Sequence, residues 1–293
     1  EKQAGDLEPG DVMLLENTRF HDEEKKNDPD FSKKLASLAD VYVNDAFGSA
    51  HRAHASTEGI TKHLPSVAGF LLEKEIKFFE PLLTSPKRPF VAIIGGAKVS
   101  TKIGVLENLI PKCDTLIIGG GMAYTFLKAE DHEIGNSLFE DEYLETAKKL
   151  LKSAKEKNVS VILPTDHLVA DKFDENAEAE KVDKIDIPAG KVAMDIGEKT
   201  LEAIRTPIEN AQSLVWNGPM GVFEFDKFAN GTLEVAKMVA ECKGMTVIGG
   251  GDSVAAVNKF NLADKIDHVS TGGGASLELL EGKTLPGIAA LES

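Results

Sequence analysis

The sequence contains little cysteine, and acidic residues outnumber basic ones. Cys113 and Cys242 are its two cysteines and form no C-x-x-C pair, so neither a disulfide framework nor a metal knuckle is expected. A reducing compartment fits this composition, and we expect a cytoplasmic protein. Lys and Arg number 33 against 48 Asp and Glu, a net charge of −15, which speaks against a nucleic-acid binder. An anionic ligand must therefore be held by a local basic cluster.

Long apolar runs are also absent. No stretch reaches the length of a transmembrane helix, so we expect no membrane partner. Apolar residues make up 42% and charged residues 28% of the 293 residues, as in globular proteins with room for two domains. No heptad pattern or long apolar edge requires an oligomer, and we expect a monomer.

The stretch Val91–Gly104, VAIIGGAKVSTKIG, is the centre of the sequence pattern. Its first four residues are typical of a buried parallel strand, and Gly95-Gly96 lets backbone amides approach a ligand above the strand end. Lys98 and Lys102 follow at a spacing of four, so a helix starting here would place both ammonium groups on one face. The pattern predicts a phosphate cradle, but neither a P-loop nor a dinucleotide fingerprint. A plain turn with two solvated lysines is the alternative.

Strands and helices alternate through residues 87–270, which predicts an α/β domain with a parallel sheet wrapped by helices. The expected strands are 91–94, 115–118, 159–163, 213–217 and 245–248. The expected helices are 100–109, 122–129, 140–157, 198–205, 229–241 and 253–260. Four strands end in glycine-containing turns, at 95–96, 119–121, 218–221 and 249–251. Four such turns in register at one sheet edge predict an open shelf suited to a nucleotide.

Two expected strands before residue 70, at 12–15 and 40–45, each precede an arginine. Arg19 and Arg52 suit bidentate recognition of phosphate or carboxylate oxygens at the carboxyl edge of a sheet. The alternative is that both pair with nearby surface carboxylates, namely Glu16, Asp22 or Asp45. His51 and His54 lie in the same cationic segment, where orientation or packing fits them better than metal binding. A helix is expected at 30–38.

Two acidic residues near the glycine turns each allow two interpretations. Asp252 either caps the helix that follows it or holds Mg²⁺, which prefers one carboxylate together with phosphate oxygens. Ser253 is the other candidate cap. Glu224 either accepts hydrogen bonds from ribose hydroxyls or is a surface carboxylate.

With these pieces placed, the chain closely resembles the phosphoglycerate kinase family. The matching segments are LENTRF at 15–20, NDAFGSAHRAHAS at 44–56, GGAKVSTKIGV at 95–105, LIIGGGMAYTFL at 116–127, VWNGPMGVFE at 215–224, VIGGGDSVAAV at 247–257 and STGGGASLELL at 270–280. They occur in order over nearly the whole sequence.

The resemblance implies reversible phosphoryl transfer from 1,3-bisphosphoglycerate to MgADP, giving 3-phosphoglycerate and MgATP. The implied substrate-binding residues are Arg19, Arg52 and His51, with His54 lining the same patch. The implied catalytic residues are Lys98, Lys102 and Gly251. The implied nucleotide-binding residues are Gly96, Lys98, Lys102, Gly120, Phe173, Met194, Asn217, Pro219, Glu224, Gly250, Gly251, Asp252 and Ser253, with Asp252 also carrying Mg²⁺.

The resemblance also implies two Rossmann-like lobes. We expect a partial phosphoglycerate-binding domain at 1–69, an interdomain helix and linker at 70–86, a nucleotide-binding domain at 87–270, and a hinge with a returning C-terminal segment at 271–293. Family members begin with an Arg-Val-Asp-Phe-Asn type motif, a further arginine and a histidine-arginine pair, which are not found here. The first lobe is therefore expected to be incomplete.

Three other functions are weighed against this one. A nucleotide-binding fragment without turnover follows if the missing motif is essential. A nicotinamide-dependent dehydrogenase is disfavoured because the G-x-G-x-x-G motif is lacking. A purely structural or partner-binding protein leaves four glycine turns unexplained.

Overall fold

The structure is a computed structural model and describes residues 2–292. It divides into two compact units, of which unit 1 comprises Glu1–Lys77 with Lys283–Ser293 and unit 2 comprises Phe78–Gly282. The division falls inside helix α4 (Phe70–Thr84), within the segment 70–86 expected to form the interdomain helix and linker. The assignment of ligands to each domain stays a prediction.

Unit 1 consists of short elements. Its helices are α1 (Lys2–Gly5), α2 (Asp22–Lys25), α3 (Pro29–Ala36) and α12 (Pro286–Ala289), its 3-10 helices are η1 (Thr18–Phe20), η2 (Phe47–Ser49) and η3 (Gly59–Lys62), and its strands are β1 (Tyr42–Asn44) and β2 (Ser66–Ala68). The two strands pair in parallel. The Gly287 N–H donates to the Ala50 carbonyl at 2.8 Å, so the last segment packs within this unit. The predicted helix at 30–38 and strand at 40–45 are confirmed.

The predicted strand at 12–15 is wrong. These residues have no regular secondary structure, and the side chains of Val12 and Leu14 are 94% and 95% exposed. An apolar run becomes a strand only where a neighbouring strand satisfies its backbone N–H and C=O groups. Among the described residues of unit 1, β1 and β2 pair with each other and neither pairs with this run.

Unit 2 is a parallel α/β fold. Its helices are α5 (Ile103–Leu109), α6 (Ala123–Ala129), α7 (Leu144–Glu156), α8 (Glu198–Asn210), α9 (Asn230–Glu241), α10 (Gly251–Lys259) and α11 (Gly274–Leu280). Its 3-10 helices are η4 (Val99–Thr101), η5 (Asp141–Tyr143), η6 (Asp226–Phe228) and η7 (Ala263–Lys265). Its strands are β3 (Phe90–Ile94), β4 (Thr115–Ile118), β5 (Ser160–Ile162), β6 (His167–Ala170), β7 (Glu180–Val182), β8 (Val192–Ile196), β9 (Ser213–Asn217), β10 (Met245–Gly249) and β11 (His268–Val269).

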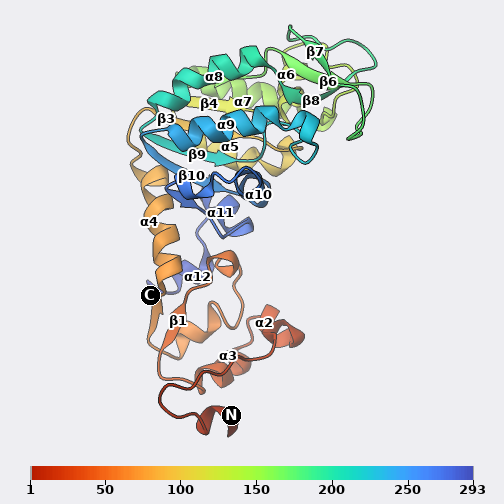
Figure 1. Cartoon of the computed structure of the whole chain (residues 1–293). Coiled ribbons are helices and arrows are strands. Elements are labelled where there is room, and N and C mark those ends of the chain that lie inside the picture. Colours follow the sequence, from red (N-terminus) through yellow and green to blue (C-terminus); the bar gives the residue numbers. More distant parts are fainter. Residues whose placement is uncertain (1, 293) are drawn as a thin grey trace. The chain divides into compact units, whose positions relative to one another are not determined.

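Six of these strands form one sheet in the order β11-β10-β9-β3-β4-β5, with every neighbouring pair parallel. Helices cover both faces of this sheet (Figure 1). On one face, Leu201, Ile204 and Ile208 of α8 and the apolar side of α9 pack on β3 and β9 around the fully buried Trp216. Apolar residues fill β3 and β9 continuously because a parallel sheet is buried on both faces. The five predicted strands and the alternation with helices are confirmed.

A second sheet, β7-β6-β8, is antiparallel. None of its three strands is among those predicted from the sequence, and β6 and β8 are the longer two. Both fall between the predicted strand at 159–163 and the predicted helix at 198–205, within one long irregular-looking and highly charged connection.

Two predictions about helix starts are wrong. Lys98 and Lys102 do not share a helical face, because Lys98 precedes η4 and Lys102 separates η4 from α5. Neither Asp252 nor Ser253 caps α10, since the helix begins at Gly251 and its cap position is Gly250, with φ +91°. A glycine adopts this left-handed conformation without the steric cost that a side chain would add.

Candidate functional site

The glycine turns after β10, β9, β3 and β4 lie side by side, because these four strands are consecutive in the sheet. Backbone hydrogen bonds tie the turns together: the Gly96 N–H donates to the Pro219 carbonyl at 3.1 Å and the Gly120 N–H to the Met220 carbonyl at 2.9 Å. A Cβ atom on Gly95 would come within 2.2 Å of the Pro219 carbonyl oxygen. The turns are glycine-rich because the backbones approach this closely. The predicted arrangement of four glycine turns along one edge of the sheet is therefore confirmed.

Two cavities open along this shelf. The phosphate-side cavity, named for its lysines, has a volume of about 430 Å³. It is lined by Gly96, Ala97, Lys98, Thr101, Lys102, Asn217, Gly218, Gly250, Gly251, Asp252, Ser253, Gly273, Gly274 and Leu277. Both lysines therefore reach one cavity although they do not share a helix. The first turn of α10 contributes its free backbone N–H groups to the same lining, as anion sites at helix starts do.

Lys102 and Asn217 form the polar centre of the phosphate-side cavity. The Lys102 ammonium donates to Asn217 Oδ1. Burial lowers the pKa of Lys102, while the carboxylates of Asp252 and Glu281 raise it. Asn217 is fully buried, and its Nδ2 atom has no hydrogen-bond acceptor among the described residues. A buried donor costs free energy unless an acceptor reaches it, so this atom fits a ligand with anionic oxygens.

The adjoining apolar cavity, called here the base cavity, has a volume of about 540 Å³. It is lined by Gly96, Ala97, Gly120, Gly121, Tyr124, Asn136, Leu138, Phe173, Val192, Ala193, Met194, Asp195, Pro219, Met220, Gly221, Val222, Glu224 and Asp252. It shares Gly96, Ala97 and Asp252 with the phosphate-side cavity, so the two adjoin. All thirteen residues predicted to bind the nucleotide line one cavity or the other.

Several lining residues were not found from the sequence. Tyr124 and Asp195 are buried, and the Tyr124 hydroxyl lies 3.2 Å from His167 Nδ1. His167 Nε2 lies 2.9 Å from the Ile185 carbonyl oxygen and donates to it, so Nδ1 accepts from Tyr124. The ring of Tyr124 thus turns its polar end away from the base cavity. Asp195 could have been noticed as an acidic residue after the apolar run Val192–Met194.

Ser253 has a different local role from the predicted cap. Its hydroxyl oxygen accepts a hydrogen bond from the Gly218 N–H, which fastens the start of α10 to the turn after β9. Trp216 fixes the same turn because its indole N–H donates to the Gly218 carbonyl at 2.7 Å.

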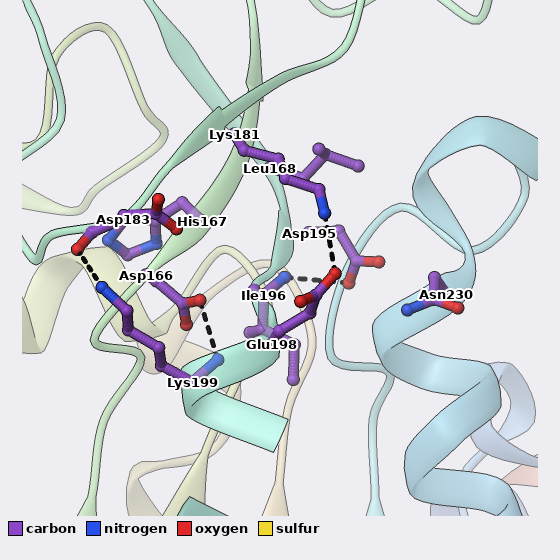
Figure 2. Close-up of a pocket in the computed structure, with 11 residues that line it drawn as sticks. Asp166, His167, Leu168, Lys181, Asp183, Asp195, Ile196, Glu198, Lys199 and Asn230 are labelled. Carbon is purple, nitrogen blue, oxygen red and sulfur yellow. Dashed lines mark hydrogen bonds and ion pairs between the residues drawn. The ribbon is translucent and has the colours of Figure 1, made fainter. Parts of the chain in front are cut away.

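A third cavity of about 490 Å³ lies behind the base cavity, and Asp195 lines both. Figure 2 shows its charged residues, with Lys181 paired to Glu198 and Lys199 directed at the main chain of Asp183. Because its lysines are already paired and its other charges are mainly acidic, this cavity does not resemble the phosphate-side cavity.

In unit 1 the predicted basic residues gather around His54. Burial lowers the pKa of His54, Glu24 raises it, and Arg19, Arg52 and Lys25 lower it further. The buried carboxylate of Glu24 accepts hydrogen bonds from the backbone N–H and hydroxyl of Ser56. It thereby fastens the segment carrying the histidines to α2.

The alternative pairing of these arginines is wrong. Within residues 2–292 neither Arg19 nor Arg52 forms an ion pair, and both are exposed. The candidate acceptors are otherwise engaged. Glu16 Oε1 accepts from the Asn17 N–H at 2.7 Å, and Asp45 Oδ1 accepts from two backbone N–H groups at the start of α4.

Two further predictions concern the two cysteines and the absence of a helix long enough to span a membrane. Both cysteines are free, as expected from their spacing. Of the helices within residues 2–292, none has the length and apolarity needed to cross a bilayer.

Fold and site together define an α/β protein of the class that binds a phosphorylated ligand at the carboxyl edge of a parallel sheet. Comparison with known proteins then identifies the family. The family model described as phosphoglycerate kinase matches residues 1–283, and the chain belongs to the phosphoglycerate kinase family.

Relatives and solved structures agree with this. A phosphoglycerate kinase of Borrelia garinii is 62% identical over 286 residues, covering 98% of this chain and 73% of the relative. The structure of phosphoglycerate kinase from Coxiella burnetii superposes with a TM-score of 0.93 at 46% identity, covering 98% of this chain and 74% of that one. The structure of phosphoglycerate kinase from Pyrococcus horikoshii superposes with a TM-score of 0.85 at 33% identity, covering 99% of this chain and 75% of that one. Family membership makes the chain a glycolytic kinase with ATP and ADP as substrates.

Proposed function

We propose that the base cavity and the phosphate-side cavity together bind the nucleotide of the phosphoglycerate kinase reaction. The observation that carries this is that the two adjoin: an apolar cavity lies beside one lined by two lysines, a helix start and Asn217, whose Nδ2 has no acceptor among the described residues. An apolar pocket followed by a cationic one matches a base followed by phosphates.

The base would pack between Phe173 and Met194, which line the apolar cavity. Glu224 lines the same cavity and would accept hydrogen bonds from the ribose hydroxyls. Pro219 and Gly120 would form the floor, and Gly96 would let the phosphates approach the backbone. Gly250 and Ser253 would position the start of α10, and Asn217 would donate to a phosphate oxygen.

Lys98, Lys102 and the Gly251 N–H are proposed as the catalytic groups. Phosphoryl transfer spreads negative charge over the equatorial oxygens of the transferred group, so positioned cations and N–H donors lower its barrier. No side chain needs to form a covalent bond. Lys102 is partly buried, which strengthens its field at the reacting group.

Asp252 is proposed to carry Mg²⁺. No group of three or more His, Cys, Asp or Glu side chains suited to a metal ion occurs among the described residues. Mg²⁺ does not require one, because it commonly binds one carboxylate together with phosphate oxygens and water. Asp252 lines both cavities, where such an ion would neutralise charge on the nucleotide phosphates.

In unit 1, Arg19, Arg52 and His51 are proposed to bind the phosphate and carboxylate of 3-phosphoglycerate or 1,3-bisphosphoglycerate. The support is that two exposed arginines without ion pairs gather near His54 in a chain whose net charge is −15. We further propose a cytoplasmic monomer that binds neither nucleic acid nor membrane, in keeping with that charge and composition.

The test is a calorimetric titration of MgADP into the chain beside a kinase assay with MgATP and 3-phosphoglycerate. Binding with turnover supports the whole proposal. Binding without turnover supports the nucleotide site and refutes independent catalysis by this chain. The variant Asn217→Leu should weaken MgADP binding, and the absence of any binding by the wild type would refute the nucleotide site.

A further inference from the structure

The segment 97–102, which carries Lys98 and Lys102, is a short connection between the turn after β3 and α5, and it contains η4. Its internal hydrogen bonds are local. The Lys102 N–H donates to the Val99 carbonyl at 2.8 Å, and the Thr101 hydroxyl donates to the Lys98 carbonyl at 2.9 Å. Because the hydrogen-bond geometry of a 3-10 turn is poor, a turn this short does not hold itself in place. Its position therefore depends on its neighbours.

Glu140 supplies a fixed point for this segment. Its carboxylate accepts two hydrogen bonds from Ser100, which lies midway between the two lysines. Oε2 accepts from the Ser100 N–H at 2.9 Å, and Oε1 accepts from the Ser100 hydroxyl at 2.6 Å. Hydrogen bonds to a carboxylate are about twice as strong as those between neutral groups. Among the described residues, the other hydrogen bond from this segment to a part of the fold beyond α5 is that from Lys102 to Asn217.

The backbone at Glu140 is itself held by other elements. The Glu140 N–H donates to the Thr125 hydroxyl at 3.0 Å, and Thr125 is fully buried in α6. Three residues earlier, the Ser137 hydroxyl accepts from the Ala193 N–H of β8 at 3.0 Å. Neither bond involves the side chain of Glu140, so both remain when that side chain is removed.

The contact between Glu140 and Ser100 lies outside both cavities but joins their walls. Asn136 and Leu138, just before Glu140, line the base cavity, and both lysines line the phosphate-side cavity. Neither Glu140 nor Ser100 lines either cavity. The pair therefore acts on a ligand only through the residues that it holds in place.

We propose that Glu140 is a positioning residue of the nucleotide site, which holds the segment 97–102 so that Lys98 and Lys102 stay at the phosphate-side cavity. This inference rests on the proposed nucleotide site. Without the carboxylate, the segment samples positions in which the two ammonium groups lie farther from the phosphates. Ordering the segment again on binding then costs conformational entropy, which lowers the affinity for the nucleotide.

The experiment is calorimetric titration of MgADP into the wild type and matched variants, each first shown to be folded by urea unfolding. Glu140→Ala removes both acceptors and should raise the Kd roughly 10-fold. Glu140→Gln should stay within about 3-fold of the wild type, because its Oε1 can accept from the Ser100 N–H while its Nε2 donates to the Ser100 hydroxyl. Glu142→Ala removes an exposed carboxylate from the same stretch and should behave as the wild type does.

Ser100→Ala tests the same contact from its other side. It keeps the N–H and loses the hydroxyl, so it should raise the Kd about 2- to 3-fold and have no further effect in the Glu140→Ala background. This variant leaves the backbone anchors of Glu140 intact, so it decides the question even where Glu140→Ala does not fold. An unchanged Kd for Ser100→Ala would contradict the proposal.

The variant Lys102→Met separates positioning from a general loss of structure. If Glu140 acts through the lysines, Glu140→Ala should raise the Kd by a smaller factor in the Lys102→Met background than in the wild type. An equal factor in both backgrounds, or an effect of Glu140→Ala no larger than that of Glu142→Ala, would overturn this inference and leave the nucleotide site standing. No MgADP binding by the wild type would overturn the nucleotide site and this inference with it.

Discussion

Asp166 supplies the N-terminal cap of α8 from a distant position in the sequence. Its Oδ2 accepts from the Lys199 N–H at 2.9 Å (Figure 2). Its Oδ1 accepts from the Thr200 N–H at 2.8 Å and the Thr200 hydroxyl at 2.6 Å. Gly197 occupies the cap position and has no side chain to do this. The first-turn N–H groups of a helix have no partners within the helix, so Asp166→Ala leaves the Lys199 and Thr200 N–H groups without an acceptor. The Thr200 hydroxyl can still donate to the main-chain carbonyl of Asp166.

The cost can be worked out from the two N–H groups. Asp166 is 3% exposed, and each buried donor left unpaired costs about 1–3 kcal/mol. Water can enter from the third cavity, which Asp166 lines, so we take the lower end of that range, about 2 kcal/mol in total. Asp166→Asn keeps one carbonyl acceptor and should lose about half as much.

Urea unfolding followed by the fluorescence of Trp216 measures this loss, because Trp216 is the one tryptophan of the sequence and packs with α8. With a slope of about 3 kcal/mol per M, the midpoint should fall by roughly 0.7 M urea. Glu198→Gln is the matched control: it breaks the exposed pair with Lys181 and should cost less than about 1 kcal/mol. A loss for Asp166→Ala no larger than the control's would refute the capping argument.

Three further outcomes are expected. The pKa of Asp195 is about 7 in the folded state against 3.8 ordinarily, so the unfolded state releases that proton at lower pH. The stability of the wild type should therefore fall relative to that of Asp195→Asn as the pH rises from 4 to 7, by up to roughly 4 kcal/mol. Urea midpoints of the two proteins that change in parallel across this range would contradict this. Lys102→Met should lower kcat by about 100-fold or more while leaving the Kd for 3-phosphoglycerate unchanged, and equal losses in the two would count against an electrostatic role. Asp45→Ala removes the acceptor of the Leu71 and Leu72 N–H groups and should cost about 1–2 kcal/mol, measured by loss of helical circular dichroism in urea, with the exposed Asp40→Ala as the control.

Much of unit 2 follows from the sequence because its signals are local. The apolar run 91–94 and its four companions are long enough to need a sheet buried on both faces, and four of the five end in a glycine-containing turn. That these turns lie along one edge of the sheet follows from parallel pairing, whereas their order along that edge comes from the tertiary structure. The family motifs lie on these turns, so the candidate nucleotide residues and the shelf were predicted together.

The run 12–15 shows where local signals fail. Its composition is that of a strand, yet a strand depends on a partner that composition does not reveal. Lys98 and Lys102 show a milder failure, because their spacing suggested one helix. The chain instead brings both to one cavity through a 3-10 turn, for which the spacing carries no signal.

The sequence by itself determined the class of fold, the phosphate-binding character of the glycine turns and the family, because these depend on short segments whose residue types have few alternative uses. Only the tertiary structure decided which carboxylates cap helices and which stay buried without a cation. Asp166 and Asp195 look alike in the sequence, each being an acidic residue near an apolar strand. One accepts the amides of α8 and the other packs against Gly221 and Gly231, because burial and hydrogen-bond partners are set by segments distant along the chain.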